Sequence, residues 1–146
     1  VTMNAPQAHF EGGLRFNSGP GFAHDFLTGW SDTSARVWFD VDVVRAGKYA
    51  VDIRYGCADS DAGSKIRISS GGQVVEAVVA AAPAPVIPLA HRDADGHSKY
   101  IDRQWGTLRA GTLKLDAGQT VIEIKAAAQT GATVMDLKAV VLTAID

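Results

Sequence analysis

The chain has 146 residues, of which 47% are hydrophobic, 21% charged and 8% aromatic. This composition is typical of one globular domain spanning residues 1–146 and excludes a disordered or fibrous protein. With 14 basic and 16 acidic residues, the net charge is -2, and no segment concentrates the lysine and arginine that nucleic-acid binding needs. No apolar run approaches the length needed to span a bilayer. We therefore expect neither a nucleic-acid partner nor a membrane partner.

Apolar and polar residues alternate with a period of two through most of the chain, and this pattern predicts strands with one buried face. It is clearest in residues 35–44 and 48–56, which we interpret as a hairpin because only a short glycine-containing link separates them. A second hairpin is predicted for residues 64–80, with Gly71 and Gly72 at its turn.

Two further runs complete the pattern. Residues 111–126 read as a third hairpin, and residues 133–142 as a final strand. The only helix-like stretch, residues 76–90, contains three prolines that forbid a continuing helix. Seven or more strands without a helix predict an all-β protein. We expect an antiparallel two-sheet β-sandwich of jelly-roll type, with a barrel as the alternative.

Two stretches, residues 12–34 and 81–106, lack the alternation and read as long loops. Long irregular loops in a compact domain often hold the functional residues. Trp30 and Trp105 lie in these loops, whereas Trp38 falls on a predicted strand.

The residues that could support catalysis give little sign of it. The single cysteine, Cys57, excludes an intrachain disulfide and a thiolate zinc cluster, and we interpret it as a buried filler at the end of a strand. Most acidic residues fall on the polar face of strands or in turns, and no nucleophile-elbow, metalloprotease or phosphate-loop motif occurs. An enzyme acting alone is therefore the weaker hypothesis.

Residues 91–105 form the richest polar segment of the chain. Asp93 and Asp95 resemble the start of a calcium loop, but the closing glutamate is missing. An aromatic plane beside guanidinium and amide donors suits a sugar, which has an apolar C–H face ringed by hydroxyls. On this ground we predict Trp105 as a sugar platform flanked by Arg103 and Gln104, completed by Tyr100 and Trp30. The alternative is a solvated loop whose Trp105 caps the core.

Four segments, residues 37–57, 63–69, 104–126 and 131–142, together resemble carbohydrate-binding modules of families 6 and 35. The likeness extends to galactose-binding-like modules attached to bacterial sulfatases and glycoside hydrolases. It rests on strand-and-turn signatures such as an Ala-Gly-x-Tyr run before an alternating strand. The resemblance implies a non-catalytic β-sandwich that tethers a neighbouring catalytic domain of the same chain to a polysaccharide or oligosaccharide.

The resemblance also implies roles for single residues. Trp105 stands where such modules place a sugar-stacking tryptophan, and Trp30 is the nearest match to a second aromatic. Many members hold a structural calcium, for which Asp136 and Glu11 would be the ligands; otherwise no cofactor is required. The asparagine that often precedes the final strand is absent here.

The sequence thus predicts an accessory carbohydrate-binding module, monomeric in isolation. We expect it to be part of a larger secreted bacterial enzyme, a glycoside hydrolase or sulfatase, located outside the cell or in the periplasm. The rival interpretation is a structural β-sandwich that packs on the catalytic domain and binds no sugar.

Overall fold

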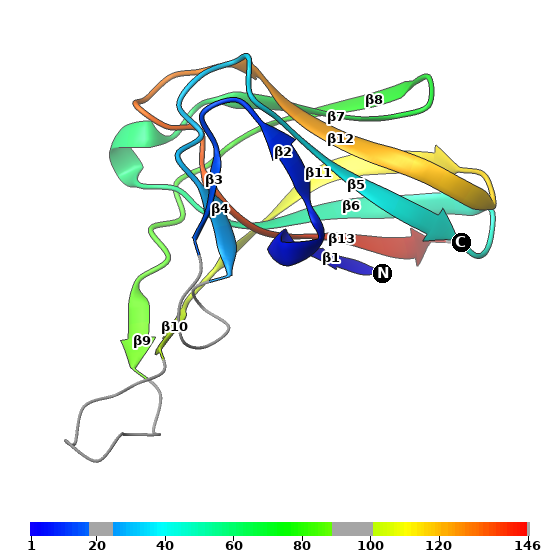
Figure 1. Ribbon diagram of the computed structural model, residues 1–146, viewed down its shortest axis with the longest axis horizontal. Helices are drawn as coiled ribbons and strands as arrows, with labels where there is room; N and C mark the ends of the chain where they lie inside the picture. Colours follow the sequence, from blue (N-terminus) through cyan, green and yellow to red (C-terminus); the bar gives the residue numbers. More distant parts are fainter. Residues whose placement is uncertain (18–24, 89–100, 146) are drawn as a thin grey trace.

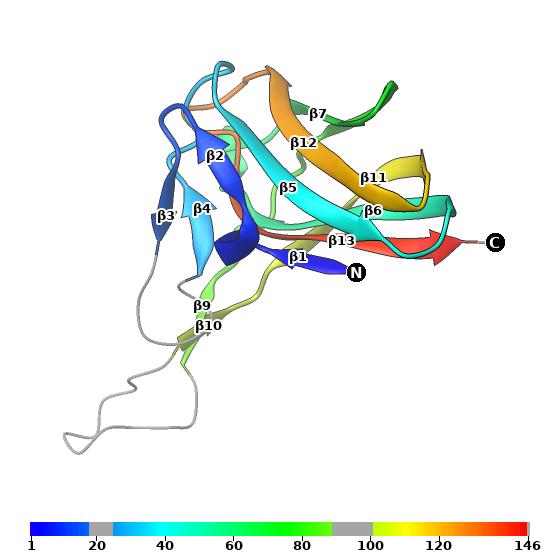
Figure 2. The same cartoon turned by 45° about the vertical axis from the view of Figure 1, so that its right-hand side comes forward.

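The computed structural model describes residues 1–17, 25–88 and 101–145, and over these ranges it consists of β-strands and two short 3₁₀ helices. Two antiparallel sheets face each other, as Figures 1 and 2 show. The predicted all-β sandwich is confirmed. Among the described residues, no helix is long and apolar enough to cross a membrane.

Each sheet combines strands from distant parts of the chain. The first sheet contains, in spatial order, β11 (Gly106–Leu115), β6 (Gly47–Gly56), β13 (Asp136–Ile145), β4 (Phe26–Thr28) and β3 (Arg15–Asn17), and β1 (Thr2–Asn4) also pairs with β13. The second sheet contains β2 (His9–Glu11), β5 (Arg36–Val43), β12 (Gly118–Ala128), β7 (Lys65–Ser70) and β8 (Gln73–Val78).

The remaining elements are short. The strands β9 (Val86–Pro88) and β10 (Ile101–Arg103) pair with each other and form a ribbon that projects from one end of the sandwich (Figure 1). The two 3₁₀ helices are η1 (Ala5–Gln7) and η3 (Asp59–Asp61).

The core lies between the two sheets, where the apolar faces of the alternating strands meet. Its largest fully buried side chains are Leu27, Trp30, Phe39, Ile53, Ile66, Ile68, Leu113, Ile122, Ile124, Met135 and Leu137. Burying one such side chain stabilises the fold by roughly 1.5–3 kcal/mol. The alternation read from the sequence therefore identifies the core-facing residues of most strands.

Two of the three predicted hairpins are wrong. The strands β5 and β6 lie in different sheets, and so do β11 and β12. Their short links cross from one sheet to the other. The alternating pattern did not reveal this, because two strands in facing sheets bury their apolar residues just as two strands of a hairpin do. Only β7 and β8 form the predicted hairpin, with Ser70 opposite Gln73 across the Gly71–Gly72 turn.

The sandwich closes along one side, where β8 of the second sheet meets β11 of the first. The Gln73 side-chain amide donates to the backbone carbonyl of Lys114, and the Lys114 amide donates to Gln73 Oε1 at 2.9 Å. A Cβ at Gly111 would lie 3.0 Å from the Val75 side chain, so glycine lets the strands approach closely. These contacts cover an edge of β11 that would otherwise expose free backbone groups.

A β-bulge in β13 breaks the alternation of the last strand. Leu137 pairs with Tyr55 and Ala139 pairs with Arg54, which leaves Lys138 as the extra residue. Leu137, Lys138 and Ala139 are all buried in succession. A bulge re-aims the side chain of its extra residue. Here it turns a lysine away from solvent and toward the end of the sandwich from which β9 and β10 project.

Candidate functional site

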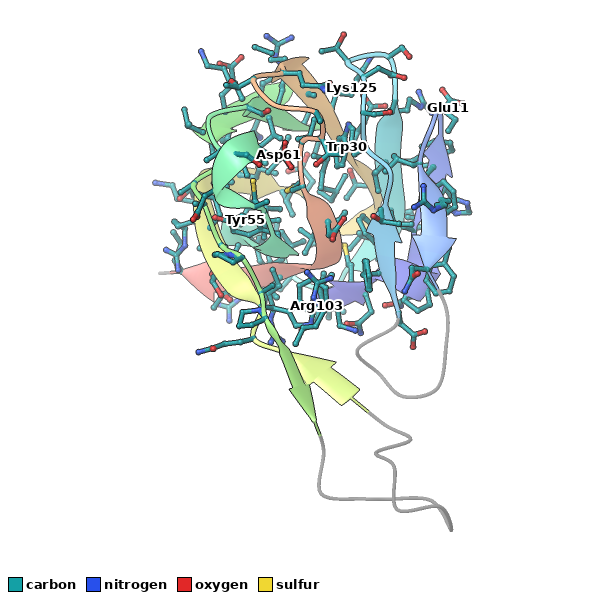
Figure 3. The ribbon with its side chains drawn as sticks, turned by 90° about the vertical axis from the view of Figure 1, so that its left-hand side faces the viewer. Glu11, Trp30, Tyr55, Asp61, Arg103 and Lys125 are labelled. Carbon is teal, nitrogen blue, oxygen red and sulfur yellow. The ribbon has the colours of Figure 1, made fainter. Side chains whose placement is uncertain are left out.

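Charged and aromatic side chains meet at the end of the sandwich that carries the β9–β10 ribbon (Figure 3). Five of them touch one another, and we call them the end cluster: Phe26, Arg103, Trp105, Asp136 and Lys138. They come from β4, β10, β13 and the short link between β10 and β11. The cluster therefore joins segments that are far apart in the sequence.

Arg103 is the centre of the end cluster, and its side chain is only 16% exposed. Its Nε donates to the backbone carbonyl of Ala84 at 2.9 Å, and its Nη1 lies 3.4 Å from Asp136 Oδ2. The other oxygen of that carboxylate accepts from the Thr28 hydroxyl at 2.7 Å. The guanidinium is thus fixed by a backbone oxygen and by a carboxylate that is itself held in place.

Trp105 is half-buried and is surrounded by cations and one aromatic ring. The guanidinium carbon of Arg103 lies 4.4 Å from the centre of its ring, and the Lys138 ammonium lies 5.8 Å away. Phe26 meets the indole edge-on, with ring centroids 5.3 Å apart. The indole N–H is buried and has no hydrogen-bond partner among the described residues. The ring is therefore held by cation–π contacts and by one aromatic contact.

Lys138 brings a second positive charge to this end although the residue is only 1% exposed. Its Nζ donates to the backbone carbonyl of Asp25 at 3.1 Å, immediately before β4. A buried ammonium is costly unless its donors are satisfied. The bulge of β13 makes this contact possible, because it aims Lys138 at the start of β4.

Two backbone positions allow the cluster to pack closely. A Cβ at Gly56 would lie 3.0 Å from the Ala84 Cβ and 3.1 Å from Arg103 Nη2, so glycine leaves room for this packing. Ala84 is the only non-glycine residue with a positive φ, 48°, in the described part of the chain. Its carbonyl is the one that accepts from Arg103. A left-handed alanine costs about 1 kcal/mol.

A small cleft of about 150 Å³ opens beside the end cluster, and its polar walls include Asp61, Arg103, Thr133 and Asp136. The two oxygens of Asp61 accept from the Ala132 amide at 2.9 Å and from the Thr133 hydroxyl at 3.1 Å. These bonds fix the loop before β13 against η3. The cleft has room for about five waters, which suits one small polar group of a ligand.

Cys57 forms part of the wall of the same cleft, and the prediction that it is buried is confirmed. Burial raises the pKa of its thiol above the ordinary value of 9.0, and the Asp61 and Asp136 carboxylates raise it further. The thiol is therefore protonated at neutral pH, which is unsuitable for a nucleophile.

The structure brings together some of the predicted sugar-binding residues and separates others. Arg103 lies beside Trp105, the two residues that the sequence placed together, and its guanidinium carbon is over the indole ring. Gln104 is exposed between them, and its backbone N–H donates to the Pro85 carbonyl at 3.0 Å. Tyr100 lies outside the described residues. Trp30 is 0% exposed, so its inclusion in the site is wrong: its indole fills the core and offers no face to a ligand.

The two predicted calcium ligands do not lie together. Glu11 is on β2 of the second sheet and pairs with Arg36 at 3.1 Å, whereas Asp136 is on β13 of the first sheet and pairs with Arg103. Figure 3 shows Glu11 and Arg103 on well-separated parts of the molecule. Within the described ranges, no group of three or more histidine, cysteine or acidic side chains could hold a metal ion. These residues do not fit a shared calcium site, and we derive no step through a metal.

Phe26 and Lys138 belong to the end cluster but were absent from the predicted site. For Lys138 the sequence did contain a signal, because it lies inside the apolar run of the last strand. Lysine is seldom buried unless its ammonium group has a partner. Phe26 gave no signal of its own, because its role depends on how β4 pairs with β13. The acidic segment around Asp93 lies outside the described residues.

Comparison with solved structures shows the same fold in proteins of low sequence identity. A family 35 carbohydrate-binding module from Clostridium thermocellum matches with a TM-score of 0.65 and 15% identity, over 99% of this chain and 98% of that module. A family 35 module from Paenibacillus barcinonensis matches with a TM-score of 0.63 and 13% identity, over 99% of both chains. The chain has the β-sandwich fold of these modules. No family model matches the sequence, and no curated protein does.

A third match shows the fold within a larger enzyme. The Podospora anserina GH26-CBM35 β-(1,4)-mannanase matches with a TM-score of 0.65 and 20% identity over 100% of this chain. The chain spans only 28% of that enzyme. The same sandwich therefore occurs both as an isolated module and as one part of a longer glycoside hydrolase.

Proposed function

We propose that this chain is a non-catalytic carbohydrate-binding module that tethers a polysaccharide-active catalytic domain, a glycoside hydrolase or sulfatase, to its glycan. The observation that carries the proposal is the end cluster, located on a sandwich that matches family 35 modules over almost its whole length. In this proposal the larger protein is bacterial and works outside the cell or in the periplasm.

The chemistry of the end cluster suits a sugar. A half-buried indole with fixed cations beside it offers an apolar surface to the C–H face of a pyranose. The Arg103 guanidinium and the Asp61 and Asp136 carboxylates form charge-assisted hydrogen bonds with hydroxyls. The small cleft would take one polar group of a sugar residue that contacts Trp105, such as a chain end or a branch.

The decisive experiment compares Trp105→Ala with the unmodified chain in affinity electrophoresis against neutral, sulfated and uronic polysaccharides. We expect the variant to lose at least about thirtyfold in affinity, because an aromatic anchor in a small site contributes about 2 kcal/mol or more. Its thermal transition should stay within several degrees of that of the unmodified chain, since Trp105 lies at the edge of the core.

Val44→Ala is the matched control, because Val44 is 91% exposed in the link between β5 and β6, at the other end of the sandwich. It should migrate like the unmodified chain. If no polysaccharide retards the unmodified chain, the structural accessory domain without sugar binding is the better interpretation. If Trp105→Ala does not fold, Trp105 is a core residue, and Gln104→Ala then tests the site through an exposed side chain.

A structural calcium ion stays a separate proposal, and chelation tests it. Treatment with a chelator should lower the melting temperature if an oxygen-ligated calcium stabilises the fold. An unchanged melting temperature would exclude this role. Glu11→Gln should abolish the effect of the chelator only if Glu11 is a ligand.

A further inference from the structure

The outward face of the second sheet holds a second arrangement of tryptophan and arginine, remote from the end cluster. Trp38 lies near the middle of this face, between His9 of β2 and Glu123 of β12 in the strand register. The guanidinium carbon of Arg36 lies 4.1 Å from the centre of the Trp38 ring. The His9 ring stacks on Trp38 as well, with centroids 5.6 Å apart and planes 22° apart.

Ion pairs across three strands hold this arrangement in place. Arg36 Nε lies 3.1 Å from Glu11, and Arg36 Nη1 lies 3.2 Å from Glu123. Because the two carboxylates approach from the strands on either side, the guanidinium is fixed beside the indole. His9 Nε2 in turn lies 2.9 Å from Asp40. The result is a preorganised aromatic group, which reduces the ordering cost of binding a ligand.

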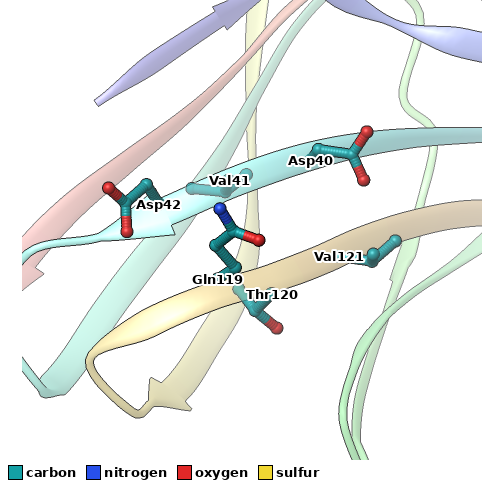
Figure 4. Close-up of a pocket in the computed structure, with 6 residues that line it drawn as sticks. All are labelled: Asp40, Val41, Asp42, Gln119, Thr120 and Val121. Atoms are coloured by element: carbon teal, nitrogen blue, oxygen red, sulfur yellow. The ribbon is translucent and has the colours of Figure 1, made fainter.

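A groove of about 430 Å³ lies on the same face, over β5 and β12 (Figure 4). Its outward-facing side chains are Asp40, Asp42, Gln119 and Val121. Asp40 follows Trp38 by two residues on the same face, about 7 Å along the strand. Asp42 lies opposite Gln119 in the register, and Figure 4 shows the Gln119 amide extending from β12 toward β5.

The walls of this groove have the groups that a sugar requires. Within the described ranges, neither the Asp42 carboxylate nor the Gln119 amide makes a hydrogen bond or ion pair. Together they offer acceptors and donors for adjacent hydroxyls. Val121 is 44% exposed and adds an apolar contact. The two carboxylates make the groove electronegative, so acidic sugars are repelled.

We propose that Trp38, Asp40, Asp42, Gln119 and Val121 form a second carbohydrate-binding site, specific for chains of neutral or amino sugars. The exposed part of the Trp38 indole contacts one sugar residue, and the groove holds the next residues of the chain. The ligand class rests on the proposed function, but the two sites lie on different faces and can be lost separately. The groove is larger than the cleft beside the end cluster, about 430 Å³ against about 150 Å³, and we therefore expect it to bind internal segments of a glycan.

Titration calorimetry of the 146-residue chain with oligosaccharides of galactomannan, xylan and chitosan tests this site, with oligogalacturonate as the acidic probe. We measure binding in the Trp105→Ala background, where only the second site remains. Trp38→Ala in that background should weaken binding to at least one non-acidic probe by tenfold or more, on the order of what loss of an aromatic anchor costs. Oligogalacturonate should not bind the groove.

The double variant Asp42→Ala/Gln119→Ala tests the groove without disturbing the Trp38 stack, because both side chains are exposed and neither forms a hydrogen bond or ion pair within the described residues. It should weaken the same binding as strongly as Trp38→Ala, and it decides the question if Trp38→Ala fails to fold. Val74→Ala, 53% exposed on the same face, is the matched control and should bind normally.

The outcomes separate this inference from the proposed function. If Trp105→Ala alone abolishes all binding, the second site does not exist, although the module still binds sugar at its end. If the groove variants lose binding and Trp105→Ala does not, the second site stands and the end cluster is not the sugar site. If the unmodified chain binds none of the probes, the inference is overturned.

Discussion

Arg103 with Trp105 and Arg36 with Trp38 are chemically the same pair in two different surroundings. The ring distances are similar, 4.4 Å and 4.1 Å. However, the Arg103 side chain is 16% exposed and donates to a backbone carbonyl, whereas the Arg36 side chain is 36% exposed and contacts two carboxylates. Burial and backbone partners therefore decide what such a pair contributes. One pair stabilises a loop junction, and the other preorganises an exposed surface.

Among the three tryptophans, we expect the largest loss of stability for substitution of Trp30, because it has no exposed surface. Trp30→Ala should lower the free energy of unfolding by about 3–5 kcal/mol, since it leaves a large cavity in the core. Chemical denaturation with intrinsic fluorescence measures the loss. A loss no larger than that of the exposed Val44→Ala control would contradict the assignment of Trp30 to the core.

Arg103→Ala should have the next largest effect. It removes charge-assisted bonds to the Ala84 carbonyl and to Asp136, and we expect a loss of about 1.5–3 kcal/mol in stability. Arg103→Lys keeps the charge but loses the planar contact with Trp105. It should recover only part of the stability and little of the glycan retention in affinity electrophoresis. Full recovery by lysine would show that charge alone matters at this position.

Arg36→Ala should cost at most about 1 kcal/mol, because exposed ion pairs contribute little and solvent screens them. The loss should shrink further in high salt. Denaturation at low and high ionic strength gives both numbers. A loss as large as that of Arg103→Ala, unchanged by salt, would mean that the two arginine–tryptophan pairs are equivalent after all.

The smallest expected effect is a pH dependence near the end cluster. Burial raises the pKa of the Cys57 thiol above 9.0 and that of the Tyr55 phenol above 10.0. Because the unfolded chain loses these protons at lower pH than the folded chain, stability present below about pH 9 is lost as the pH rises through the folded-state values. Cys57→Ala should reduce this alkaline loss. Denaturation profiles that coincide for the two proteins would contradict the assignment.

Local sequence patterns predicted the strands, because alternation reports which side chains are buried and the core then buries them. They also predicted the Gly71–Gly72 turn and the burial of Cys57, both of which depend on neighbours in the sequence. The proximity of Arg103 and Trp105 could be predicted for the same reason, since they are two residues apart. Arg36 and Trp38 have the same spacing, but the sequence predicts only a strand there and no binding site.

Which strands pair, and which distant side chains meet, was decided only by the tertiary structure. Alternation is satisfied equally by a hairpin and by two strands in facing sheets, so β5 and β6 could not be assigned to different sheets from the sequence. The bulge that aims Lys138 at Asp25 depends on the register between β13 and β6. The burial of Trp30 depends on both sheets closing over it. The sequence pattern determines which face of each strand is apolar. Long-range packing determines which strands become neighbours, because the free energy of a contact depends on both of the groups that meet.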